Sequence, residues 1–557
     1  MKKTILTIIA ILAAALANAG DRVVERTYLS TDKACYVAGD NIWLSAFCLD
    51  AADGGKPSNF SSIAYVELCS ASGVEATAKV ALMDGRGAGN LVIPRSLPTG
   101  NYKLIAYTAQ NRNEVGYDFF ETSKTVSVFN TFTSERAKDN VEIVSDAVYG
   151  TPEALQGDGK VAVAVSSKEV RSARISLSSK LSKAASLSVS VYHEDALKSP
   201  LNDGVAEFLG RVSRTTVPEF TESVITDFEG EVIVGHCVGK DAAKYVNSYA
   251  VIASPSDLSG IYYSAIESDG SIKFCTNNYY GDNVLVCQIE SQDEVGDAHI
   301  EFDSPFVDNK ASDIAKMQIC PGLEESLSLR GTSMQIEKLF VSDTLFDKLP
   351  QRPNLLLEAS EPTSYILKDY TRFPVMNEVF VELVKGLKFK HEDKKPYVHV
   401  TLLDSSKPSF SSARGALVLV DGIPVLDHQK IYDYDPLLVE RIDVYPATYF
   451  VGPRCCLGIV NMVTYKRNMP TLTFPDAVRV VDFQGACFPQ AYTCRGISEN
   501  ANYPDYRSTV YWHPMVDLKA GESLELDCQL PKYEGSFRVV VEGISEDGEP
   551  VYETLLF

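Results

Sequence analysis

The residues best able to do chemistry in this chain are its seven histidines, twelve cysteines and many carboxylates. The histidines are scattered through the sequence: His193, His236, His299, His391, His399, His428 and His513. A catalytic histidine needs a nucleophile within reach and a third group that orients it. The sequence contains no Gly-x-Ser-x-Gly elbow, no His-Glu-x-x-His, no Walker loop and no dinucleotide-binding glycine motif. We therefore expect a protein that is not an enzyme, with no catalytic residue.

The cysteines leave three roles open: metal ligands, disulfides and buried thiols. No pair combines a Cys-x-x-Cys spacing with histidines at the distance that zinc sites use, so we expect no metal and no cofactor. Cys275 and Cys287 flank a turn-rich stretch, and Cys487 and Cys494 would close a short loop. Both pairs are disulfide candidates in an exported protein, whereas buried free thiols are the simpler expectation for most cysteines.

Acidic and aromatic pairs raise carbohydrate chemistry as an alternative. Asp433 and Asp435 form one acidic pair, and Tyr262 and Tyr263 form one aromatic pair. Glycoside hydrolysis needs two carboxylates about 5–10 Å apart across a sugar cleft. Surface carboxylates and cross-strand tyrosine pairs are the commoner roles of such residues.

Residues 1–19 have the pattern of a signal peptide. Two lysines precede an apolar run over 5–16, and Ala-Asn-Ala at 17–19 fits a cleavage site. No later stretch has the roughly 20 apolar residues of a membrane-spanning helix. We expect an exported, water-soluble protein, in the periplasm or peripheral to the outer membrane, with no membrane-spanning segment of its own. The net charge of −22 argues against nucleic acid as a partner, because phosphate contacts need clustered Lys and Arg.

A chain of 557 residues is too long for one core and predicts several domains. Strands with period-two alternation, separated by turn signals, predict a mainly β multidomain protein of tandem immunoglobulin-like β-sandwiches with one small α+β domain. The expected divisions are the signal peptide over 1–19, β-sandwiches over 20–130, 131–217 and 218–310, a helical segment and linker over 311–362, the α+β domain over 363–468, and a C-terminal β-domain over 469–557.

Two helices and one hairpin are specific enough to be checked. Leu323, Leu327 and Met334 follow helical spacing, although Arg330 interrupts their stripe, and we favour a helix there. A second helix is expected to begin at Pro374, because proline suits the first helical position.

The hairpin is the stretch ALVLVDGIPVLD over 416–427. Asp421 and Gly422 predict a type I′ turn, which needs a positive φ at both central positions. The flanking residues are apolar on both faces. We expect the helix from Pro374 and the strands around Ile442 and Val460 to cover the hairpin within its own domain.

Two stretches resemble macroglobulin-type domains. The N-terminal stretch matches that family's Thr-Asp-Lys and Tyr-x-x-Gly-(Asp/Gln) pattern at Thr31, Asp32, Lys33, Tyr36, Gly39 and Asp40. The C-terminal stretch matches at Arg507, Thr509, Trp512, Gly535 and Phe537. The resemblance implies macroglobulin-like β-sandwich modules.

The thioester motif Gly-Cys-Gly-Glu-Gln is absent from the sequence, so covalent trapping by that chemistry is excluded. A thioester-less protease binder with a bait segment in the 341–362 linker is an alternative.

The 363–468 domain resembles the plug domain of TonB-dependent outer-membrane receptors. The match covers an apolar-Asp-Gly-x-Pro hairpin, a Pro-x-x-Val-Glu strand, a Tyr…Gly loop and a Gly-Ile-Val strand, in the family's order. The resemblance implies these interaction residues: Asp421, Gly422, Pro424, Glu440, Tyr449, Gly452 and Asn461. Only 91 residues follow Lys466, too few for a barrel of about 22 strands, so transport by this chain alone is not expected.

Together, macroglobulin-like modules and a plug-like domain without a barrel resemble a family of Bacteroidota envelope proteins. The resemblance implies a non-enzymatic exported scaffold or binding protein. Its plug-like domain would dock to an outer-membrane or periplasmic protein, or to an uptake or assembly machine.

Overall fold

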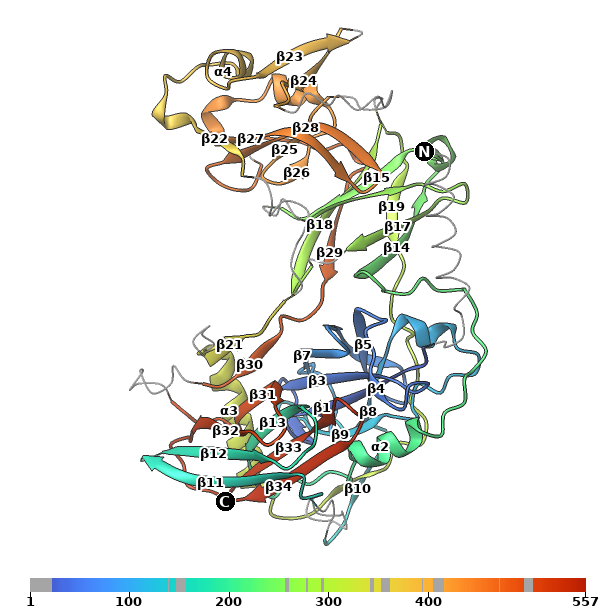
Figure 1. Ribbon diagram of the computed structural model, residues 1–557, viewed down its shortest axis with the longest axis vertical. Helices are drawn as coiled ribbons and strands as arrows, with labels where there is room; N and C mark the ends of the chain where they lie inside the picture. The colour runs from blue at the N-terminus through green and yellow to red at the C-terminus, as the bar shows by residue number, and fades with distance from the viewer. Residues whose placement is uncertain are drawn as a thin grey trace. The chain divides into compact units, whose positions relative to one another are not determined.

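The computed structural model describes residues 23–557 except 139, 147–156, 170, 256–259, 277–278, 292–294, 341–344, 352–360, 393, 404–414, 470 and 495–503. The expected signal peptide lies outside these residues. The chain divides into two compact units. Unit 1 consists of Met1–Phe228, Phe306–Gln351 and Ala486–Phe557, and unit 2 of Glu229–Pro305 and Arg352–Gly485. The chain therefore leaves unit 1 twice and returns to it twice, as the colours of Figure 1 trace.

Unit 1 begins with a β-sandwich whose strands lie between Glu25 and Phe129. One sheet contains β1 (Glu25–Thr31), β3 (Asn41–Asp50), β4 (Lys56–Pro57) and β7 (Arg86–Val92). The other runs in the order β2 (Cys35–Val37), β9 (Lys124–Phe129), β8 (Gly100–Tyr107), β5 (Ile63–Cys69) and β6 (Val74–Ala81). Aliphatic side chains of both sheets form a shared core, as period-two alternation requires.

The second β-sandwich of unit 1 is assembled from two distant parts of the chain. Its smaller sheet has the order β11 (Val161–Glu169), β12 (Ser172–Ser179) and β32 (Ser523–Gln529). Its larger sheet has the order β21 (Phe346–Lys348), β30 (Gln490–Tyr492), β31 (Thr509–Leu518), β13 (Ala185–His193), β33 (Phe537–Ser545) and β34 (Pro550–Leu556).

This arrangement corrects the expected domain division. Residues 131–217 and 469–557 were expected to form separate domains, but strands from both segments pair within the same two sheets and share one core. Each segment alone presents apolar strand faces without enough partners to cover them. Pairing across more than 300 residues of sequence buries those faces.

Two helices, α2 and α3, pack against the strands of unit 1. The expected helix is present as α3 (Glu324–Leu339), and Arg330 within its apolar stripe is buried. A shorter helix that the sequence reading missed, α2 (Val205–Val212), buries Phe208 against Tyr28 of β1, with ring centroids 5.1 Å apart. The strands β10 (Val141–Ile143) and β20 (Met317–Ile319) pair in parallel beside α3.

Unit 2 contains the third β-sandwich. One sheet has the order β17 (Ser271–Thr276), β14 (Glu231–Val238) and β19 (His299–Phe302). The other has the order β16 (Ile261–Ala265), β15 (Tyr249–Ala253), β18 (Asp282–Glu290) and β29 (Arg479–Gln484). Since β29 pairs with β18, residues 479–484 belong to this sandwich and not to a C-terminal domain.

The α+β part of unit 2 is a five-stranded sheet in the order β22 (Thr363–Ile366), β27 (Val439–Val451), β28 (Arg454–Thr464), β25 (Leu417–Val420) and β26 (Ile423–Pro424). The hairpin of β23 (Leu387–Glu392) and β24 (Lys395–Val400) and the helices α4 (Met376–Glu382) and α5 (His428–Tyr432) accompany it. The helix α4 begins two residues after Pro374, with Val375 as its N-cap residue.

The covering of the 416–427 hairpin differs from expectation on one face. Val418 and Val420 pack with α4 and with Ile442 and Val460, as expected, and also with α5 and the β23–β24 hairpin. Leu419 and Ile423 on the opposite face pack against β15, β16 and β18 of the preceding sandwich. Two sheets thus lie face to face, which explains why the hairpin is apolar on both sides.

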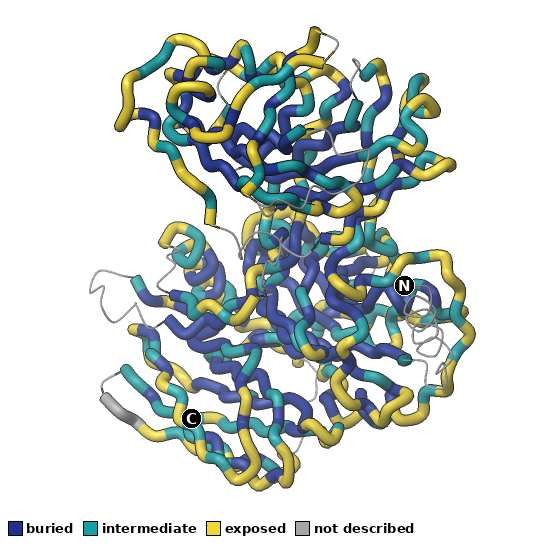
Figure 2. The backbone as a smooth tube through the Cα atoms, turned by 45° about the horizontal axis from the view of Figure 1, so that its top comes forward, coloured by how far each residue is buried: buried dark blue, intermediate teal, exposed yellow. Residues whose placement is uncertain are grey.

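Central strands such as β3 and β5 are almost entirely buried, whereas the edge strands β4 and β22 are mostly exposed; Figure 2 colours the buried segments dark blue. The fold is mainly β and multidomain, as the alternating sequence pattern predicts. No helix among the described residues is both long and apolar enough to cross a membrane.

Candidate functional site

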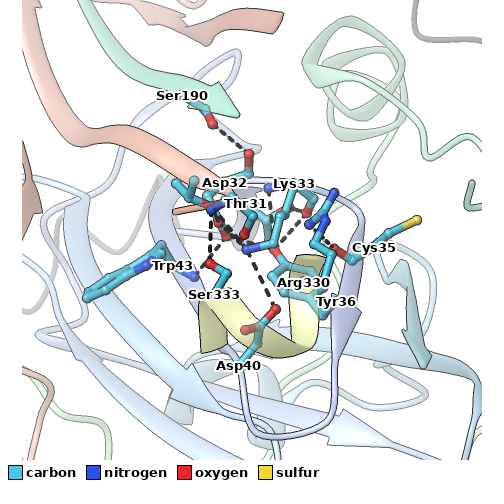
Figure 3. A network of polar contacts seen from close by, with 12 residues as sticks. Thr31, Asp32, Lys33, Cys35, Tyr36, Asp40, Trp43, Ser190, Arg330 and Ser333 are labelled. Atoms are coloured by element: carbon cyan, nitrogen blue, oxygen red, sulfur yellow. Dashed lines mark hydrogen bonds and ion pairs between the residues drawn. The ribbon is translucent and has the colours of Figure 1, made fainter. Parts of the chain in front are cut away.

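The two stretches that resemble macroglobulin domains meet at a buried carboxylate in unit 1, Asp32 (Figure 3). Its Oδ1 accepts from the Tyr36 hydroxyl at 2.8 Å and from the Trp43 backbone N–H at 3.1 Å. Its Oδ2 accepts from Lys33 Nζ at 2.9 Å and from Thr509 Oγ1 at 2.5 Å. Asp32 and Thr509 are 477 residues apart in the sequence, so their hydrogen bond joins the two sandwiches of unit 1.

The Lys33 ammonium is equally enclosed. It donates to Asp32 and to Thr509 Oγ1 at 3.0 Å, and it lies 4.5 Å from the centroid of the Tyr36 ring. Asp40 Oδ2 lies 4.0 Å away on the other side. Burial raises the pKa of Asp40, and Lys33 opposes that shift. An ammonium with two hydrogen-bond acceptors and an aromatic face is well compensated for its lost hydration.

Helix α3 closes the junction from a third side. Arg330 Nε donates to Asp195 at 2.6 Å, and its NH1 donates to the backbone oxygen of Cys35 at 3.2 Å. The Ser508 backbone N–H donates to Ser333 Oγ at 3.1 Å. The buried arginine that interrupts the apolar stripe of α3 is therefore a paired charge in this junction.

Glu337 lies one turn beyond Ser333 on α3 and has a raised pKa. Ser333 Oγ donates to Glu337 Oε1 at 3.0 Å. Burial, reinforced by the charge of Asp40, raises the pKa of Glu337 to about 7. Its carboxylate and carboxylic acid forms are therefore both accessible near neutral pH.

Aromatic packing reinforces the same junction. Trp43 stacks on Tyr492 with ring centroids 5.7 Å apart, and both rings pack with fully buried Trp512 and with Phe346. Arg507 is buried beside them, held by two hydrogen bonds to Asp505 of 2.7 and 3.0 Å. Four of the five C-terminal residues of the resemblance, Arg507, Thr509, Trp512 and Phe537, are therefore buried in the core or the junction of unit 1, whereas Gly535 is exposed.

This junction is built for holding segments together. Both oxygens of Asp32 accept two hydrogen bonds each, which fills the carboxylate's capacity. A general base needs a lone pair directed at a substrate, and here every lone pair is directed at protein.

The plug-like residues in unit 2 are centred on Asp421. Asp421 and Gly422 have φ values of 49° and 85°, which confirms the predicted type I′ turn. The Asp421 side chain is buried and accepts from Thr464 N at 2.7 Å, Thr464 Oγ1 at 2.6 Å and Met469 N at 2.9 Å. It therefore ties the turn to the end of β28.

Gly422 and Asn461 continue this local network. The Gly422 backbone N–H donates to Asn461 Oδ1 at 3.2 Å, and Asn461 is buried on β28. The backbone oxygen of Pro424 accepts from Gln288 Nε2 of β18 at 2.9 Å. These three residues therefore hold the hairpin against its neighbours.

The remaining plug-like residues lie on the strands that follow. Glu440 forms an ion pair with Arg467 at 2.7 Å, and the ring of Tyr449 meets that of Tyr445 edge to face. Gly452 has a φ of 56° in the turn between β27 and β28, and a Cβ there would lie 3.0 Å from the Tyr263 backbone oxygen. A side chain at this turn would be strained and crowded.

One polar cluster between the two layers of unit 2 had no signal in the sequence. Arg454 NH2 of β28 forms an ion pair of 2.9 Å with Glu290 Oε1 of β18. Burial raises the pKa of Glu290, and Arg454 opposes this shift. Only the packing of the two sheets brings these strands together.

The structure also shows the state of the cysteines and of the residues that could bind a metal ion. All twelve cysteines are free thiols, and eight of them are buried. Cys275 and Cys287 lie on β17 and β18, which belong to different sheets, so the pairing considered from their spacing does not form. No group of three or more His, Cys, Asp or Glu residues in the described part of the chain is placed to hold a metal ion.

No protein-family model matches the sequence, and no curated protein does. Among solved structures, native Escherichia coli alpha-2-macroglobulin is similar at 9% identity over 96% of this chain and 39% of its own, with a TM-score of 0.23. A Salmonella alpha-2-macroglobulin mutant is similar at 10% identity over 97% of this chain and 40% of its own, with a TM-score of 0.23. Dimeric latent PorU from Porphyromonas gingivalis is similar at 10% identity over 50% of this chain and 33% of its own, with a TM-score of 0.15. The chain spans about two fifths of the macroglobulins' length, and likeness at these TM-scores carries no argument about function.

Proposed function

We propose that this chain is a non-enzymatic scaffold and binding protein exported to the bacterial envelope, in which β-sandwiches carry a plug-like α+β domain that docks to an outer-membrane protein. The observation that carries the proposal is the path of the chain around the α+β part. Residues 486–557, which follow it, return to complete the sheets of unit 1. The α+β part is thus an insertion borne by a β-sandwich framework.

The burial and hydrogen bonding of the polar side chains support a binding role. Asp32, Lys33 and Arg507 are buried, and their side chains form hydrogen bonds to other segments of the chain, at Thr509 and Gln529. Asp421 does the same within the α+β sheet. The residue types best suited to catalysis therefore stabilise the framework, and a rigid framework favours presentation of a preformed surface.

The resemblance of the motif order in 417–464 to receptor plug domains supports an outer-membrane protein as the partner. In this reading Asp421, Gly422 and Asn461 preserve the shape of the plug-like fold and do not themselves contact the partner. The surface residues of the same domain would make the contact.

The direct test is affinity purification of the tagged full-length chain from detergent-solubilised outer membranes of the native host, followed by quantitative mass spectrometry. An unrelated exported protein with the same tag is the control. We expect a barrel-forming outer-membrane protein to be enriched at least tenfold over the control. Recovery of no barrel protein, or release of a polysaccharide fragment by the purified chain, would overturn the proposal.

A further inference from the structure

One end of the α+β sheet carries a group of large apolar side chains that are open to solvent. Ile366, Tyr370, Leu437 and Tyr465 are 40%, 45%, 53% and 51% exposed. We refer to these four residues as the Tyr370 surface. Isolated exposed apolar residues are ordinary, whereas several gathered at one place indicate a contact site.

Hydrogen bonds and strand register show that the four residues are neighbours. Arg372 NH1 donates to the Tyr465 hydroxyl at 3.3 Å, and its NH2 donates to the Pro436 backbone oxygen at 2.7 Å, next to Leu437. Ile366 lies opposite Arg441 in the β22–β27 register. The 3-10 turn Leu367–Asp369 connects Ile366 to Tyr370, whose backbone N–H donates to Leu367 O.

The Tyr370 surface borders a strand edge. Among the described strands, β22 pairs only with β27, so it forms the end of its sheet. The N–H and C=O groups on the outer edge of such a strand are matched by another extended backbone. The occupant that fits this edge is therefore an extended segment, which would add to β22 as a sixth strand.

The charges around the Tyr370 surface select the sign of the occupant. Lys368 and Lys466 are exposed and form no ion pair with any described residue, and Arg372 donates only to neutral oxygens. The other two cations nearby are neutralised: Arg441 by Asp443 at 2.9 Å and Arg467 by Glu440 at 2.7 Å.

Three cations that form no ion pair with a described residue therefore lie around the apolar side chains, beside two exposed carboxylates. These are Asp369 in the adjoining turn and Asp435, whose Oδ1 accepts from the Leu437 backbone N–H at 2.8 Å. This local excess of positive charge stands out in a chain of net charge −22. Complementary charge favours an acidic segment and speeds its encounter with the surface.

We propose that the Tyr370 surface binds an extended acidic and apolar segment of a partner protein, which pairs with the outer edge of β22. The inference rests on the proposed function and names the partner's chemistry. Tyrosine and arginine are the residue types that most often dominate binding energy at interfaces, and both are present here. Acidic side chains of the segment would face Lys368 and Lys466, and its apolar side chains would cover Tyr370 and Leu437.

The test uses the full-length chain and two synthetic probes, the capped peptides EVEVEVEV and KVKVKVKV, with binding measured by fluorescence anisotropy at low salt. We expect the acidic peptide to bind at least ten times more tightly than the basic one and to weaken as salt rises, because screening acts on exposed charges. Equal affinities, or no binding of the acidic peptide, would overturn the proposal.

Charge reversal at the surface provides the matched variants. Lys368→Glu with Lys466→Glu should weaken the acidic peptide at least tenfold, and Leu437→Asn should weaken it several-fold. Lys240→Glu with Lys388→Glu, two exposed lysines of the same unit outside this surface, is the control and should leave the affinity unchanged. Equal affinities for the surface variant and the control would also overturn the proposal. Circular dichroism confirms that each variant is folded.

Failure of this inference is distinguishable from failure of the proposed function. If the Lys368→Glu, Lys466→Glu chain still enriches a barrel protein as the native chain does, the docking proposal stands and the Tyr370 surface is the wrong surface. If the acidic peptide binds as expected but no barrel protein is enriched, the surface stands and the outer-membrane partner is wrong.

Discussion

The two units each bury a carboxylate at a point where segments meet, but they compensate it differently. In unit 1, Asp32 accepts from the ammonium of Lys33 as well as from neutral donors, and one of its partners, Thr509, is 477 residues away in sequence. In unit 2, Asp421 accepts only from backbone N–H groups and a hydroxyl, all within 48 residues. Unit 1 thus uses an ion pair to join distant segments, whereas unit 2 uses neutral donors to fix a local turn. The comparison predicts different costs when each carboxylate is neutralised.

The largest effect is expected for Asp32→Asn. The change leaves Lys33 buried with Asp40 at 4.0 Å as its nearest remaining carboxylate. Breaking a buried ion pair on one side costs about 3–5 kcal/mol. Both tryptophans of the chain lie in unit 1, so tryptophan fluorescence during urea unfolding reports this unit. Asp53→Ala removes an exposed ion pair in the same unit and should cost less than about 1 kcal/mol. A cost for Asp32→Asn no larger than that of Asp53→Ala would contradict the junction.

Asp421→Asn is expected to have a smaller effect, confined to unit 2. Asparagine keeps the size and tolerates the positive φ, but its amide group faces N–H donors that then lack an acceptor. An unsatisfied buried donor costs about 1–3 kcal/mol. Hydrogen exchange should accelerate in 417–424 and 454–464, while the tryptophan-detected transition of unit 1 stays in place. A shift of that transition would show that the two units do not unfold independently.

His428 predicts how unit 2 responds to acid. Burial lowers its pKa to about 4, and its Nδ1 accepts from the Val398 N–H at 3.0 Å, which requires the neutral ring. The unfolded chain takes up the proton first, so this contribution to stability is complete above about pH 6.5 and is lost as the pH falls towards 4. We expect unit 2 to lose about 1–2 kcal/mol between pH 7 and 5 from this residue. His428→Gln should remove that loss, whereas His391→Gln, at an exposed position, should not.

Glu337 should make unit 1 less stable as the pH rises, which is opposite to the effect of His428 on unit 2 and is the smallest effect expected here. Because its pKa is raised to about 7, the folded state holds the proton more tightly than the unfolded chain. Its contribution is complete below about pH 4.5 and is lost as the pH rises through 7, by about 1 kcal/mol after allowance for its partial exposure. Glu337→Gln should flatten the pH dependence of the tryptophan-detected transition between pH 5 and 7, and Glu324→Gln at the exposed start of α3 should not. If Glu324→Gln flattens it equally, the burial of Glu337 is not the cause.

Local features of the fold were readable from the sequence because their causes are local. The type I′ turn at 421–422 follows from two residues that accept a positive φ, and α3 follows from apolar spacing despite the arginine within it. The alternation of strands gave the mainly β class for the same reason. The roles of the candidate interaction residues were not readable in this way, since the structure places Asp421, Gly422 and Asn461 in internal hydrogen bonds.

Partner choice was decided only by the tertiary structure. The alternation of apolar and polar residues in a strand predicts which of its faces is buried, but it does not predict which distant strand will cover that face. For this reason the sequence predicted separate domains for 131–217 and 469–557, although their strands pair in the same sheets. For the same reason it predicted that both faces of the 416–427 hairpin would be covered within one domain. The sequence by itself determined the export signal pattern, the β-rich class and the turn chemistry. Packing decided that Asp32 meets Thr509, that Arg454 meets Glu290 and that β22 ends its sheet, because burial free energy depends on the whole set of faces available for pairing.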